Sequence, residues 1–292
     1  MAVQKEARLD QPLPSEAKPT ITSTALTPDL ASAVMNLTLE TKLSRQSGLN
    51  SYLFKDVKTV GLLVVIAASV LRYRLADYFE HVHWRLLLKN THFISDLLQT
   101  VLFIITISAG VFVFLARYTE ILKEEVEDVK NNTPKYFGLD LKQFAQLPQD
   151  VKDSKYNEKG KLSDLAELAA LASYVQVVQY RDVPIASIAI ARDEASLRIL
   201  SYGIRRIYVK SGIMSDLLLW VKFKANTIAK NEKSKVDVTV DMYSFENFDR
   251  KLLASAGYSK VSDEKLGIWV LDLYGVRKET WKLSVGDASE QS

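Results

Sequence analysis

The pattern of apolar and polar positions divides the chain into a central apolar block and mixed polar flanks. The longest uncharged stretch runs from Leu97 to Ala116, and 13 of its 20 residues are Leu, Ile, Val or Phe. A helix rises about 1.5 Å per residue, so a stretch of this length covers roughly the 30 Å hydrocarbon core of a bilayer. The stretch therefore predicts a transmembrane helix and an integral membrane protein.

A second uncharged stretch, Thr59–Leu71, precedes the first and has only 13 residues. Alone it covers about 20 Å as a helix, but the flanking Lys58, Arg72 and Arg74 can reach the membrane interface with their side chains. We expect a transmembrane hairpin over residues 51–118 with both ends on one side. A re-entrant first arm is the alternative. Near the hairpin, positive charge does not indicate the orientation, because four Lys or Arg residues lie before it, four in its loop and four after it. Those before it are Lys42, Arg45, Lys55 and Lys58, and those after it are Arg117, Lys123, Lys130 and Lys135.

Both arms of the expected hairpin carry small residues, which allow membrane helices to approach closely. These candidate packing residues are Gly61, Ala67 and Ala68 on the first arm and Thr106, Ser108 and Gly110 on the second. Either the two arms pack on each other through them, or they contact a membrane-embedded client.

The segments on either side of the hairpin differ in character. Residues 1–26 are rich in Pro, Ser, Thr and charge, which is typical of a disordered arm. Residues 27–50 predict an amphipathic helix that starts at Thr27 and Pro28 and ends at Gly48. It lies either on the membrane surface or on the folded domain. Residues 119–160 predict a charged helix followed by a connector that contains Pro134, Gly138 and Pro148.

The second half of the chain predicts an α/β (α+β) domain over residues 161–284, followed by a polar tail, 285–292. Its period changes from helix to strand near Tyr174. Expected strands are 174–180, 185–190, 203–209, 236–242 and 268–273, and expected helices are 215–230 and 245–256.

This order resembles the GCN5-related N-acetyltransferase fold, and two stretches of sequence resemble it as well. "IRRIYVKSGIMSDLL" is similar to the fourth strand and pyrophosphate loop of that family, and "VDVTV…FENFDRKLLASAGY" to its fifth strand and following helix. The resemblance implies a mixed sheet with flanking helices after the transmembrane hairpin.

The chain departs from that family where its chemistry resides. The loop corresponding to the coenzyme A cradle is Lys210, Ser211, Gly212, Ile213 and Met214, with Met214 where a glycine is expected. Asp216 adds a negative charge that repels phosphate, and Leu253 occupies the position of the usual tyrosine acid. We therefore expect no catalytic residue and no cofactor. A membrane-anchored N-acyltransferase using acetyl coenzyme A is the alternative.

Composition removes several other classes of function. The net charge is +3 without long runs of one sign, which excludes a nucleic-acid partner. The chain has no cysteine, which excludes disulfides and thiolate zinc sites and is typical of a domain that faces the cytosol. His81, His83 and His92 lie near the hairpin loop with Glu80 and Asp96, but their spacing alone does not predict a metal site.

The combination of the polar arm, "TPDLASAVMNLTLE", "KNTHFISDLLQTVLFIITISAG" and the altered acetyltransferase-like domain resembles one family along most of the chain. This is the family of fungal endoplasmic reticulum proteins required to package the high-affinity inorganic phosphate permease into export vesicles. The resemblance implies a multi-pass protein of the endoplasmic reticulum membrane with both termini cytosolic. It also implies a chaperone without catalysis, whose partners are the polytopic permease, the lipid bilayer and vesicle-coat components.

Overall fold

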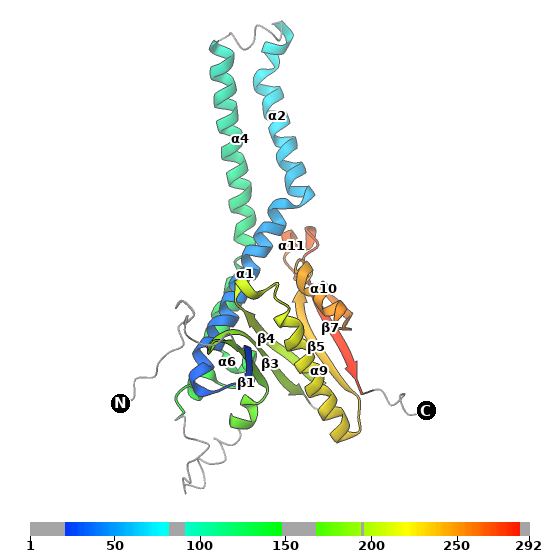
Figure 1. The fold of residues 1–292 in the computed structure, drawn as a ribbon. Coiled ribbons are helices and arrows are strands. Elements are labelled where there is room, and N and C mark those ends of the chain that lie inside the picture. Colours follow the sequence, from blue (N-terminus) through cyan, green and yellow to red (C-terminus); the bar gives the residue numbers. More distant parts are fainter. Residues whose placement is uncertain (1–20, 82–90, 148–167, 194–195, 287–292) are drawn as a thin grey trace, which may run out of the picture.

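The computed structural model describes residues 21–81, 91–147, 168–193 and 196–286. A globular part is built around one sheet, and two long helices project together from it (Figure 1). The helices are α1 (Ala31–Lys55), α2 (Val57–His81), α4 (Thr91–Tyr118), α5 (Ile121–Asn131), α6 (Thr133–Phe137), α7 (Leu141–Phe144), α9 (Ile213–Glu232), α10 (Asn247–Ser255) and α11 (Trp269–Leu273). Short 3-10 turns are η1 (Pro28–Leu30) and η3 (Arg206–Tyr208). The strands are β1 (Ile21–Ala25), β2 (Val175–Tyr180), β3 (Val183–Asp193), β4 (Ser196–Ile204), β5 (Val236–Tyr243), β6 (Ser259–Lys265) and β7 (Arg277–Val285).

The described strands form one mixed sheet in the order β1-β2-β3-β4-β5-β7-β6. Neighbouring strands are antiparallel except for β4 and β5, which run parallel. These two strands are paired only at their beginnings, from Ser196 opposite Asp237 to Ile199 opposite Val240. Beyond those positions β4 and β5 continue without pairing to each other, so the sheet is parted at their ends.

Helices cover both faces of the sheet. Successive residues of β3 point to opposite faces, and Ile188 belongs to the apolar cluster under α9 whereas Ala189 belongs to the cluster under α1. The helices α6 and α7 lie on the same side as α1. Helix α1 therefore precedes the apolar helices α2 and α4 in sequence but packs in the core of the sheet, most of whose strands come after them.

Helix α1 approaches β4 closely at a glycine. A Cβ atom on Gly203 would lie 2.5 Å from the backbone carbon of Leu37, so no larger residue fits without moving the helix. The amide of Ile204 also donates to Oγ1 of Thr41, at 3.0 Å. Because Leu37 is fully buried, this contact fixes α1 on the sheet.

The apolar helices α2 and α4 lie largely outside the core. The stretches Val57–Tyr78 and Thr91–Asn131 are long and apolar enough to cross a membrane, and only 11% and 6% of their most apolar windows are buried. Core helices of a soluble domain would be mostly buried. This exposure supports membrane association. At the far end the two helices meet through Tyr78 and Phe93, whose ring centres lie 5.3 Å apart.

The expected fold class is confirmed: two apolar helices are followed by a mixed sheet with flanking helices. Two of the expected strands were wrong. The strand expected at 203–209 is β4 at Ser196–Ile204, and η3 follows it, because the buried alternation begins earlier than Gly203. The strand expected at 268–273 is helix α11, which lies between Gly267 and Gly275, both at positive φ. Strands β6 and β7 were not predicted from the sequence, and β6 is mostly exposed and polar.

The expected boundaries before the apolar helices also differ from the structure. Ile21–Ala25, assigned to the disordered arm, pairs with β2 as an exposed edge strand; backbone hydrogen bonds rather than burial stabilise it. The helix expected to end at Gly48 continues to Lys55 and docks on the sheet rather than on the membrane surface. The expected domain start at residue 161 lies outside the described residues.

Candidate functional site: a charged cavity at the parted ends of β4 and β5

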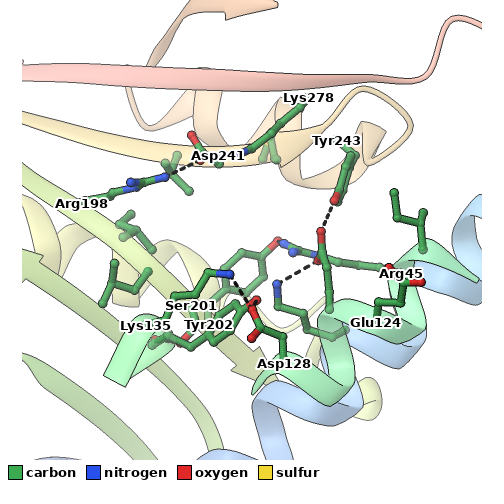
Figure 2. Close-up of a pocket in the computed structure, with 18 residues that line it drawn as sticks. Arg45, Glu124, Asp128, Lys135, Arg198, Ser201, Tyr202, Asp241, Tyr243 and Lys278 are labelled. Atoms are coloured by element: carbon green, nitrogen blue, oxygen red, sulfur yellow. Dashed lines mark hydrogen bonds and ion pairs between the residues drawn. The ribbon is translucent and has the colours of Figure 1, made fainter. Parts of the chain in front are cut away.

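A cavity of about 510 Å³ lies between α1, α5 and α6 on one side and β4, β5 and β7 on the other. Figure 2 shows charged side chains pointing into it from both sides. The charged and aromatic residues that line it are Lys42, Arg45, Glu124, Glu125, Asp128, Lys135, Tyr136, Arg198, Tyr202, Asp241, Tyr243 and Lys278. Its position next to the parted strands makes it the first candidate for a binding or catalytic site.

A buried chain of polar contacts crosses the parting between the two strands. Nε of Arg45 lies 2.6 Å from Oε1 of Glu246, and the same guanidinium donates to the hydroxyl of Tyr202 at 2.8 Å. The hydroxyl of Tyr202 donates to Asp249 at 2.7 Å. Burial raises the pKa of Tyr202 well above its usual value, so the hydroxyl keeps its proton. Arg45 of α1 therefore joins the end of β4 to the segment that follows β5.

A second group of contacts joins α1 to α5 and β5. Nζ of Lys42 lies 3.1 Å from Oε2 of Glu125, and the hydroxyl of Tyr243 donates to the other oxygen of that carboxylate. Burial lowers the pKa of Lys42, and the nearby Arg45 lowers it further. Burial also raises the pKa of Tyr243 far above its usual value. Glu125 is thus shared between a helix of the N-terminal part and a strand of the sheet.

Most of the remaining charges of the cavity are also paired. Asp241 accepts from Arg198 at 2.7 Å and lies 3.1 Å from Nζ of Lys278, while Asp128 pairs with Lys135 at 2.5 Å. Burial favours a raised pKa for Asp241, but its two cationic partners lower the pKa below its usual value. Every lysine and arginine in the cavity's described lining therefore has a carboxylate partner. The arrangement stabilises the contact between α1, α5 and the sheet, and the carboxylates of Glu125, Asp128 and Asp241 are engaged in ion pairs.

The loop expected to correspond to a coenzyme A cradle lies elsewhere. Gly212 has a φ of 88° and precedes α9, while Ile213 and Met214 are each only 6% exposed and belong to the main apolar core. Lys210 and Ser211 are exposed, and the hydroxyl of Ser211 donates to the carbonyl of Tyr208. The last two residues of the loop therefore contribute to packing.

The other two residues of the expected acetyltransferase-like site lie in different surroundings. Asp216 is exposed in the first turn of α9, and Leu253 is buried in the core under α10. Of the histidine group near the hairpin loop, His83 lies outside the described residues. Asp96 accepts a hydrogen bond from Tyr78 at 2.6 Å.

The small residues of the apolar helices are mostly exposed. A Cβ atom on Gly61 or Gly110 would meet nothing within 4 Å, so these glycines do not serve close packing within the protein. Thr106 and Ser108 donate to carbonyls of their own helix, at 2.9 and 2.8 Å. Ala68 is exposed and Ala67 partly exposed.

The buried cluster of Arg45, Tyr202, Glu246 and Asp249, the Arg45 cluster, was not predicted from the sequence. In the sequence Arg45 stands only as one positive charge near the hairpin, far from Tyr202, Glu246 and Asp249. One signal was available: Leu37, Thr41 and Arg45 follow at intervals of four along one helix face, which places a charge on the face that packs on the sheet.

The exposed apolar helices α2 and α4 are typical of a membrane-associated protein. Its mixed-sheet domain includes helix α1, which precedes them in sequence. The family model of the inorganic phosphate transporter chaperone Pho86 matches residues 3–285, so the chain belongs to that family. This confirms the family resemblance of the sequence. No curated protein matches the chain.

Solved structures similar to the globular part include several acetyltransferases. The putative acetyltransferase YncA of Salmonella typhimurium, solved with acetyl-CoA, is 14% identical over 48% of this chain and 84% of its own, with a TM-score of 0.33. Ard1 of Thermoplasma volcanium is 11% identical over 46% of this chain and 84% of its own, also with a TM-score of 0.33. The putative streptothricin acetyltransferase of Bacillus anthracis is 14% identical over 37% of this chain, with a TM-score of 0.32, and the match spans only 60% of its length. Structural similarity at these identities and TM-scores supports no conclusion about the activity of this chain.

Proposed function

We propose that this protein acts in the endoplasmic reticulum membrane as a chaperone that assists the folding and vesicle export of a phosphate transporter, without catalysis. Membership of the phosphate transporter chaperone family supports the client class. The proposed client is a high-affinity phosphate permease, and vesicle-coat components are further proposed partners of the globular part.

The observation that carries the proposal is the open surface of the apolar helices at small residues. Gly61 and Gly110 lie on exposed faces of α2 and α4, with space beside each. Membrane helices associate through such residues because the backbones can come close. Since α2 and α4 do not use these glycines to pack within the protein, a client helix is the partner they fit.

The pairing of β1 with β2 supports a topology in which both flanks lie on one side of the membrane. β1 precedes the apolar helices and β2 follows them, yet Ile21 pairs with Tyr180 in one sheet. Two spans return the chain to the side where it began, as a hairpin requires. We propose that this side is the cytosol. Asn36 and Asn131 begin glycosylation triplets on exposed positions, so detection of glycans on either would contradict the cytosolic orientation.

The test of client packing is the double substitution Thr106→Leu and Gly110→Leu. It leaves membrane insertion intact, because leucine is more apolar than either residue. We expect a phosphate permease to accumulate in the endoplasmic reticulum, whereas other polytopic proteins travel normally. Val113→Leu, at a large exposed residue of the same helix, is the matched control and leaves permease transport unchanged.

Two outcomes would contradict parts of the proposal. Normal permease transport in the double variant would remove the intramembrane contact but leave the chaperone role. Normal permease transport after deletion of the whole protein would remove the chaperone role itself.

A membrane-anchored N-acyltransferase is the second candidate, favoured by the parting of β4 and β5. The buried contacts of Arg45 with Tyr202 and Glu246 occupy the region where the strands part, which argues against a substrate there. Measured acetyl transfer from acetyl coenzyme A would favour this second candidate.

A further inference from the structure

Helix α11 is attached to the base of the apolar helix pair. The hydroxyls of Tyr274 and Thr59 lie 2.8 Å apart in a buried contact, and the hydroxyl of Tyr52 donates to the carbonyl of Tyr274 at 3.1 Å. Nζ of Lys58 donates to the carbonyl of Leu273. Figure 1 shows α11 at the end of the globular part from which α2 and α4 project. Since Thr59 begins the uncharged stretch of α2, α11 lies at the level where that stretch starts.

The outer face of α11 is apolar and uncovered. Trp269 and Leu273 are one helical turn apart and are 65% and 57% exposed, while Val270 and Leu271 between them are buried in the core. The ring of Trp269 meets that of Tyr118, at the end of α4, with centres 6.3 Å apart. Exposed apolar side chains at this level need an apolar or interfacial environment.

An apolar groove of about 430 Å³ continues this face onto the helix pair. Trp269 and Leu273 line it together with Leu62 of α2 and with Gly110 and Phe114 of α4. The exposed face of α11 and the exposed face of the apolar helices are thus one continuous surface. The medium that surrounds the apolar helices at this level therefore also contacts α11.

We propose that α11 is a third membrane-contacting element, lying in the interfacial layer of the bilayer with Trp269 and Leu273 at the boundary between headgroups and acyl chains. Tryptophan and tyrosine favour this layer because their rings are apolar with one polar group. Lys58 and Arg117 lie near the same ends of α2 and α4 and supply cations for lipid phosphates. When no client is bound, the occupant of the groove is a lipid acyl chain, since the groove opens onto the surface that the bilayer covers.

This inference goes beyond the proposed chaperone role. The apolar helices alone would allow the globular part to tilt relative to the membrane. Contact of α11 with the bilayer adds a point of attachment beside the end of α1, through the segment between β6 and β7. The globular part then has one fixed orientation to the membrane, whether or not a client is present.

The absence of cysteine in the chain makes a direct test possible. Trp269→Cys and Leu273→Cys are prepared separately, labelled with an environment-sensitive fluorophore, and the full chain is reconstituted into phosphatidylcholine vesicles. Phe223→Cys on α9 is the matched control, because Phe223 is an equally exposed apolar residue at 67% and lies away from α11. Both substituted α11 residues are exposed, so neither change removes core packing.

We expect lipids with a quencher near the headgroup to reduce fluorescence at positions 269 and 273 at least twofold more than at 223. Iodide in the aqueous phase should quench the control at least twofold more strongly than the α11 labels. Equal iodide quenching at all three positions would overturn the proposal. Protection from both quenchers would also overturn it, because a second copy of the chain would then cover the face. The vesicles contain no transporter, so the result is independent of the chaperone role.

Discussion

Nε of Arg45 lies 2.6 Å from Oε1 of Glu246, which joins the helix before the apolar pair to the segment after β5. The side chains of both residues are largely buried, at 12% and 7% exposure. A buried charge that loses its partner costs several kcal/mol, whereas a surface pair contributes about 1 kcal/mol or less. The stability of the docked α1 therefore depends more on this pair than on the exposed ion pairs around the cavity.

Arg45→Met is expected to destabilise the protein by about 3–5 kcal/mol, because the substitution leaves Glu246 buried without its cation. Thermal unfolding of the purified chain in mild detergent, followed by circular dichroism, measures the shift of the midpoint. Arg198→Met on β4 is the control; its side chain is 56% exposed, and we expect a loss of about 1 kcal/mol or less. Equal shifts of the unfolding midpoint in the two variants would show that the buried pair contributes no more to stability than the exposed pair.

The ion pairs of Asp241 predict a dependence of stability on pH. Its pKa is lowered from the ordinary value of 3.8, so the folded state binds its proton less readily than the unfolded state. The carboxylate therefore stabilises the fold above that value, and the contribution is lost as the pH falls through the lowered pKa. We expect Asp241→Asn to be less stable than the natural chain at neutral pH by about 1 kcal/mol.

The same comparison at low pH provides the internal control. Once the pH has fallen below the lowered pKa of Asp241, the natural chain and Asp241→Asn should converge in unfolding midpoint, because both then carry a neutral side chain. A difference that persists unchanged from neutral to acidic pH would mean that the substitution acts through shape rather than charge.

Gly203→Ala is expected to weaken the docking of α1 by about 1–3 kcal/mol. The added Cβ would lie 2.5 Å from the backbone of Leu37, so the helix must move away from β4. Gly61→Ala is the matched control, since its Cβ meets nothing within 4 Å and alanine favours a helix by about 1 kcal/mol. Limited proteolysis of the N-terminal segment reports the release of α1. Faster cleavage in both variants would exclude the close contact as the cause.

The purified chain is expected to show no saturable binding of acetyl coenzyme A at submillimolar concentration in calorimetry. Ile213 and Met214, at the start of α9, are buried in the core, and Asp216 in the first turn opposes a pyrophosphate. Asp216→Ala tests the charge separately. Binding by the natural chain would contradict this reading of the loop, and binding only by the variant would assign the loss to the single carboxylate.

The sequence predicted those elements whose pattern is local and left out those that depend on distant pairing. β5 alternates buried and partly exposed residues along its length, so its period was visible. Ile268–Leu273 is apolar in the manner of a strand, but the glycines at 267 and 275 confine it to one helical turn. The Arg45 cluster could not be predicted from spacing, because its members come from α1, β4 and the segment after β5 and meet only when the sheet is complete.

The pairing of β1 with β2 also fixes an order of events during synthesis. β1 and α1 leave the ribosome before the apolar helices, while β2, β3 and β4 are made after them. At about 5–20 residues per second, the first strand waits on the order of ten seconds or more for its neighbour. Both apolar helices are therefore synthesised while the N-terminal segment still lacks a partner. A fragment that ends after α4 contains no complete fold, and the domain closes only when the last strands have been translated.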